Sequence, residues 1–119
     1  MGRQMDQKAA VRLQNLLCHR FGQPFVASDP DSMVGFALKS VGRVPINGLR
    51  HPAVENSNGW YIWMGEFSTA LDFFSPMHTS HLFEKLPEVV EFLGLPPGHR
   101  FLLAPDHVDV WYDEELLNF

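Results

Sequence analysis

Two histidines and a glutamate spaced three residues apart form the most reactive pattern in the sequence: His78, His81 and Glu84. Residues three apart lie on one side of a helix, and imidazole and carboxylate groups are common zinc ligands. A metalloprotease helix instead carries histidines four apart with a glutamate directly after the first, where Thr79 stands here. Histidines at a helix start also bond to backbone or water. We therefore expect no metal and no cofactor, and a metal- or small-molecule-binding site at these three residues remains the alternative.

Cys18, the single cysteine, gives little support to nucleophilic catalysis. Adjacent helix residues point about 100° apart, so His19 is badly placed to act as its base. A thiol among leucines is usually buried and inert. The sequence also contains neither the Gly-Lys-Ser/Thr of a phosphate-binding loop nor the Gly-x-Ser-x-Gly of a hydrolase. We predict that the protein is not an enzyme and has no catalytic residue.

The C-terminal segment is the more informative one, since residues 106–115 hold five carboxylates and no Lys or Arg. On a strand, one face would carry valines and a tyrosine and belong to the core, while the other would carry an indole between carboxylates. An aromatic anchor beside charges is typical of an interface with a basic partner. Alternatively, Trp111 covers the core edge and Asp113 caps a short helix. The candidate partner-binding residues are Asp106, Asp109, Trp111, Asp113, Glu114 and Glu115.

Charge is unevenly distributed along a chain of net charge −5. Residues 1–65 hold seven basic and four acidic side chains, whereas residues 66–119 hold two basic and ten acidic ones. This balance argues against nucleic acid as a partner, because phosphate binding needs Lys and Arg. The acidic half is either a solvated face or a surface that attracts a basic protein. Apolar runs are far shorter than the roughly 20 residues of a membrane span, and the N-terminus lacks a secretory pattern, so we expect a cytoplasmic protein that does not bind membranes.

The elements that must position these residues follow from hydrophobic periodicity and from glycine and proline. Apolar residues at three- and four-residue spacing predict helices, and alternation predicts strands joined by short turns. The pattern predicts one α+β domain over residues 1–119 with a mainly antiparallel sheet of four to five strands, an N-terminal helix and a mid-chain helix pair. The expected helices cover residues 5–21, 79–86 and 87–93, and the expected strands cover residues 33–41, 60–66, 100–104 and 107–112, with a further short strand near 44–49 inside the connection 42–59.

Several short segments within residues 46–113 form a recognisable set. They are Asn58-Gly-Trp-Tyr-Ile-Trp-Met-Gly-Glu66, Phe73-Phe-x-Pro-x-His78, His81-Leu82, Leu95-Pro-Pro-Gly-x-Arg-Phe101 and Asp109-Val-Trp-Tyr-Asp113. These segments resemble small immunity proteins of bacterial polymorphic-toxin systems, specifically immunity family thirty-three and its relatives. The resemblance implies a cytoplasmic α+β protein that binds a cognate toxin and blocks it without catalysis.

Overall fold

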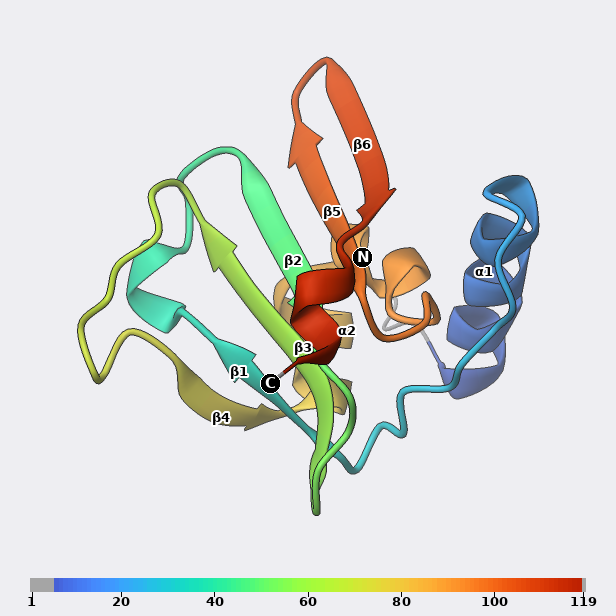
Figure 1. Ribbon diagram of the computed structural model, residues 1–119, viewed down its shortest axis with the longest axis horizontal. Coiled ribbons are helices and arrows are strands. Elements are labelled where there is room, and N and C mark those ends of the chain that lie inside the picture. The colour runs from blue at the N-terminus through green and yellow to red at the C-terminus, as the bar shows by residue number, and fades with distance from the viewer. Residues whose placement is uncertain (1–5, 119) are drawn as a thin grey trace.

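The computed structural model describes residues 6–118, and six strands within that range form one mixed sheet (Figure 1). Their order across the sheet is β4-β1-β3-β2-β5-β6. Strand β1 runs parallel to β3, and the other neighbouring pairs are antiparallel. The strands are β1 (Met33–Phe36), β2 (Ile46–Arg50), β3 (Ser57–Met64), β4 (Ser75–His78), β5 (His99–Ala104) and β6 (His107–Tyr112).

The α+β class is confirmed, but the expected four to five strands become six, and one pair is parallel. The additional strand is β4, a four-residue segment that contains Pro76. Proline has no backbone N–H to donate and therefore belongs at sheet edges. Strand β4 lies at one end of the sheet and pairs with β1. Such a short edge strand leaves no alternating pattern in the sequence, which explains why it was not predicted.

The strand expected over residues 33–41 covers only its first four residues, after which the chain enters the 3-10 helix η1 (Leu38–Ser40). The hydroxyl of Ser40 explains the break. It donates to the carbonyl of Ala37 at 2.6 Å and accepts from the backbone N–H of Met64 at 2.9 Å. The Ser40 hydroxyl thus accepts the hydrogen bond from β3 that a paired strand would otherwise accept. The following connection 42–59 contains β2, close to the expected residues 44–49, and the start of β3.

The predicted helices are confirmed in position: α1 (Gln7–Arg20), α2 (Thr79–Lys85) and η2 (Pro87–Phe92). Residue 5, the first of the expected N-terminal helix, lies outside the described residues. Asp6 caps α1 by accepting from Ala9 N at 2.8 Å. The second helix of the mid-chain pair is a 3-10 helix. Among the helices of residues 6–118, none is both long and apolar enough to cross a membrane.

Strand β3 lies inside the sheet and is packed on both faces. On one face of the sheet, Trp60 and Ile62 belong to the main core, which also includes residues of α1, α2 and η2. Helix α1 packs against η2 and lies to the side of the sheet (Figure 1). Trp63 belongs to a smaller cluster on the other face. That face is covered by the loop 65–74 and by the C-terminal 3-10 helix η3 (Glu114–Leu117) rather than by long helices (Figure 1). Its ring contacts involve Tyr61, Trp63, Phe67, Phe73 and Phe74.

Arg50, at the end of β2, is 2% exposed and holds two loops and the start of β3 together. Its guanidinium donates to the carbonyls of Asn58, Val26, Ala27 and Leu95 at 2.8–3.0 Å. Burial lowers the pKa of Arg50 to about 10, so the side chain stays protonated at neutral pH. The guanidinium thus donates to backbone carbonyls that would otherwise be buried without a donor, and the carbonyl dipoles stabilise its positive charge.

Candidate functional site

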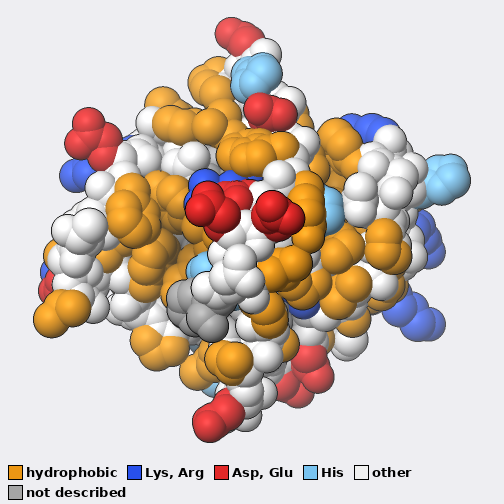
Figure 2. Space-filling model, in the orientation of Figure 1, with side chains coloured by type: hydrophobic (Ala, Val, Ile, Leu, Met, Phe, Trp, Pro, Cys, Tyr) orange, Lys and Arg blue, Asp and Glu red, His pale blue; other side chains and the backbone are white. Residues whose placement is uncertain are grey.

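The acidic C-terminal residues lie on and after a β-hairpin at one end of the sheet. Strands β5 and β6, which were expected over residues 100–104 and 107–112, pair over their whole length around a Pro105-Asp106 turn. The hairpin extends beyond the rest of the sheet (Figure 1). On the face without long helices, carboxylates lie at the tip of the hairpin and over η3 (Figure 2). Strand β6 is therefore the last strand of the sheet and carries part of the candidate surface.

The expectation that one face of β6 is core is only partly right. Val110 packs against the main core. Val108 and Tyr112 share its face, yet they are 56% and 55% exposed. An end strand has a neighbouring strand on one side only, so its apolar side chains are covered less than those of a central strand. The hairpin consequently presents apolar surface that the sequence pattern alone assigns to the interior.

On the opposite face, Trp111 is 38% exposed and lies across from Arg100 of β5. Trp111 belongs to none of the core clusters formed by residues 6–118. The exposed part of the indole can still be buried against a partner, and aromatic rings are among the largest contributors to interfaces. The neighbouring carboxylates are exposed and, within the described part of the chain, take part in no ion pair: Asp106, Asp109, Glu114 and Glu115.

Asp113 differs from the other carboxylates because it is engaged within the fold. Its Oδ2 lies 3.4 Å from Nε of Arg100, and its Oδ1 accepts from the backbone N–H of Glu115 at 3.1 Å. The second contact caps η3, which is the helix-cap role considered for this residue. Leu116 then packs into the smaller core cluster. Asp113 thereby fixes the position of the two glutamates that follow it.

The histidine pattern does not assemble into a metal centre. His78 is the residue before α2, and His81 lies in its first turn, with the ring centroids 5.7 Å apart. Both rings and Glu84 are exposed. Within residues 6–118, no group of three or more His, Cys, Asp or Glu side chains is arranged to hold a metal ion.

Cys18 lies in the main core, as expected of a thiol among leucines. Burial raises the pKa of its thiol, while the positive charge of Arg50 acts in the opposite direction. A raised pKa keeps the sulfur protonated and therefore a poor nucleophile.

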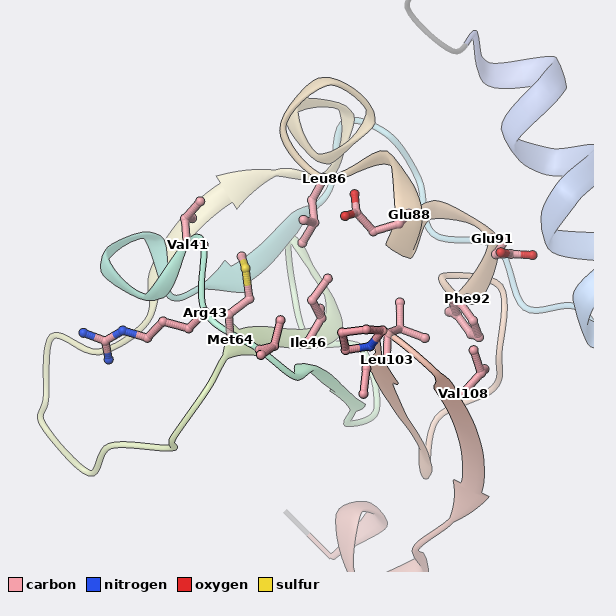
Figure 3. A pocket seen from close by; sticks show the side chains of 14 residues that line it. Val41, Arg43, Ile46, Met64, Leu86, Glu88, Glu91, Phe92, Leu103 and Val108 are labelled. Carbon is pink, nitrogen blue, oxygen red and sulfur yellow. The ribbon is translucent and has the colours of Figure 1, made fainter.

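A groove of about 600 Å³ lies between η2, β2 and the β5–β6 hairpin, and sequence reasoning did not identify it (Figure 3). Its floor is apolar. The carboxylate of Glu88 points over the groove, whereas the guanidinium of Arg43 points away from it (Figure 3). The Oε1 atom of Glu91 lies 3.7 Å from Nη2 of Arg20. The groove is formed by several separate segments, so no local pattern in the sequence could reveal it. It is lined by Val41, Gly42, Arg43, Val44, Ile46, Met64, Leu86, Glu88, Glu91, Phe92, Leu103, Ala104, Pro105 and Val108.

Comparison with known proteins identifies the kind of molecule that carries these surfaces. No match was found among curated proteins or among solved structures. A family model, that of the Imm33-like domain, matches residues 13–113. The match begins within α1 and includes all six strands, among them both strands of the acidic hairpin. It agrees with the resemblance of the short segments to immunity family thirty-three. The chain belongs to the Imm33-like family of immunity proteins.

Proposed function

We propose that this protein is a bacterial immunity protein that binds a cognate toxin in the cytoplasm and neutralises it by covering its surface. Membership of the Imm33-like family is the observation that carries the proposal. The action is stoichiometric binding without catalysis, metal or cofactor. The partner is a protein with a basic surface, and neither nucleic acid nor a membrane takes part.

The proposed toxin-binding surface consists of Asp106, Asp109, Trp111, Glu114 and Glu115. Trp111 is the apolar anchor, since its exposed indole can be buried against the partner. The four carboxylates lie before and after it along the chain, from the hairpin tip to η3, and are exposed. Asp113 supports this surface from within, through its contacts to Arg100 and to the backbone of η3.

The negative charge of the proposed surface favours a partner with a basic surface. Since the four exposed carboxylates form no ion pair within residues 6–118, their field extends into the solvent. Long-range attraction of this kind raises association rates by about 10- to 1000-fold. A toxin must be captured before it acts, so fast association suits an immunity protein.

Expression of the flanking genes tests the proposal directly. Each gene next to the one encoding this chain is expressed alone in bacteria, and then together with it. We expect one flanking product to arrest growth alone and to be harmless in the presence of this protein. That product and this chain should then copurify as a complex. If none of the flanking products is toxic, or if toxicity persists when this chain is present, the proposed function is wrong.

A further inference from the structure

The outer edge of β6 carries backbone groups that the sheet leaves without partners. The N–H of Asp113 donates to the carbonyl of Gly98 at 2.7 Å. In an antiparallel pair, residues that bond to the partner strand alternate with residues that bond away from it. Trp111 and Asp109 therefore bond toward β5, and the residues between and beside them bond outward. The residues with outward-facing N–H and C=O groups are Val108, Val110 and Tyr112.

The two edges of the sheet differ in whether a further strand can pair with them. Strand β4 has four residues and contains Pro76, and both shortness and proline prevent the addition of another strand. Strand β6 has six residues and no proline. Five of its six side chains are exposed, so little else covers this edge. Of the two edges, β6 is the one that can accept a further strand.

The charges of β6 select the occupant of this edge. Asp106 precedes the strand, Asp109 lies within it, and Glu114 and Glu115 follow it. A second copy of the chain that paired with β6 would place these carboxylates beside those of the first copy, and like charges across strands are unfavourable. A basic strand would instead meet an opposite charge at each of these positions. Glu88 lines the same groove as Val108 and adds negative charge on the helix side of the edge.

We infer that β6 receives an extended, positively charged segment of the toxin as a seventh strand of the sheet. This inference rests on the proposed function and specifies its geometry. Backbone hydrogen bonds from Val108, Val110 and Tyr112 hold the segment, in the manner of strand addition at open sheet edges. Trp111 and Asp109 contact its side chains on one face of the sheet, and Val108 and Tyr112 contact them on the other.

Amide hydrogen exchange is the direct test, with the toxin identified by the flanking-gene experiment as the probe. In the free protein, the amides of Val108, Val110 and Tyr112 should exchange faster than those of Asp109 and Trp111, which bond to β5. In the complex, the three outward amides should slow by at least about tenfold, because a hydrogen-bonded amide exchanges only when the bond opens.

Two substitutions at one position provide a matched pair. Val108→Pro removes an outward N–H and leaves the bonds to β5, whereas Val108→Thr keeps both the N–H and the shape. We expect the proline variant to bind the toxin at least about tenfold more weakly than the threonine variant, as the loss of one buried hydrogen bond implies. Protection of the Asp109 amide in the free proline variant checks that its hairpin is intact.

The outcomes separate the two proposals. A complex in which the outward amides exchange as in the free protein, or in which both variants bind equally, overturns the strand addition and leaves the proposed function in place. The absence of any complex contradicts the proposed function itself.

Discussion

At the scale of single residues, Arg50 connects several backbone segments of this fold, although no motif in the sequence marks it. A charged residue with 2% exposure is expected to have an acidic partner. Arg50 is held instead by backbone carbonyls from the loops after α1 and η2 and from the start of β3. The planar guanidinium, with its five N–H donors, is the group that can reach so many acceptors at once.

We predict that Arg50→Met lowers the free energy of unfolding by at least about 3 kcal/mol. Several buried carbonyls lose their donor, and each buried polar group left without a partner costs about 1–3 kcal/mol. Urea unfolding of the variant and the wild-type protein measures the difference. Arg50→Lys, which retains the charge and fewer donors, should lie between them and remain folded.

Arg43→Met is the matched control, because Arg43 is exposed and its guanidinium points into solvent (Figure 3). Its effect should stay within about 0.5 kcal/mol, as is usual at the surface. Equal stability losses for Arg43→Met and Arg50→Met would show that the carbonyl contacts of Arg50 contribute nothing.

His99, which is 5% exposed, gives the protein a predictable response to acid. Burial lowers the pKa of its imidazole, and the backbone hydrogen bond to Pro96 opposes that shift in part. In the unfolded chain, His99 takes up its proton near pH 6.5, which is above the pKa in the folded state. The unfolded state therefore binds more protons in this range, and stability decreases as pH falls below about 6.5.

We predict that His99→Asn makes the loss of stability between pH 7 and pH 5 shallower. Asparagine can donate to the carbonyl of Pro96 but does not titrate. Urea unfolding at several pH values measures the slope. His107→Asn, at an exposed position of β6, should keep the slope of the wild-type protein, and a wild-type slope in His99→Asn as well would refute the assignment.

At the scale of elements, η3 shows that a short helix can be fixed from both ends. Asp113 caps it and contacts Arg100, and Leu116 packs into the smaller core cluster. The carbonyl of Leu116 also lies 2.9 Å from Nδ1 of His51. These contacts, rather than helix propensity, hold a four-residue element in place, since helices of this length are not stable alone.

We predict that Asp113→Ala costs about 1 kcal/mol of stability, the typical value of a helix cap. Asp113→Asn should cost less, because its side-chain oxygen still accepts from Glu115 N. Thermal unfolding compares the two. Asp109→Ala removes an exposed carboxylate from the same hairpin and should leave stability within about 0.5 kcal/mol. A loss as large in Asp109→Ala would remove the distinction between the supporting and the exposed carboxylates.

At the scale of the whole molecule, the position of charge rather than its amount should control capture of the toxin. We predict that Asp109→Lys combined with Glu115→Lys slows association with the toxin by at least about tenfold at low salt. The difference should shrink as salt is added, because exposed charges are screened. Stopped-flow or surface-based binding kinetics at two salt concentrations measure both effects.

The control is Asp29→Lys combined with Asp31→Lys, which changes the net charge equally in the loop between α1 and β1, where both residues are exposed. This variant should associate nearly as fast as the wild-type protein. If both double variants slow association equally, net charge alone directs the encounter and the proposed surface has no special part in it.

Elements with strong periodicity or unambiguous turns can be predicted from local patterns in the sequence. The N-terminal helix, the two apolar faces of β3 and the Pro105-Asp106 hairpin were predictable because their signals lie within a few neighbouring residues. The same local patterns carried the resemblance to immunity proteins. The acidic composition of the C-terminal segment was equally visible, but not which of its carboxylates are exposed and which one is engaged.

Features that depend on pairing between distant segments appear only in the tertiary structure. Strand order made β6 an end strand and so exposed Val108 and Tyr112, which alternate as core residues do. The carbonyl acceptors of Arg50 and the walls of the groove come from segments far apart in the chain. Periodicity records which side of an element is apolar. Whether another element covers that side depends on its neighbours in the sheet, and this is settled only when the chain folds.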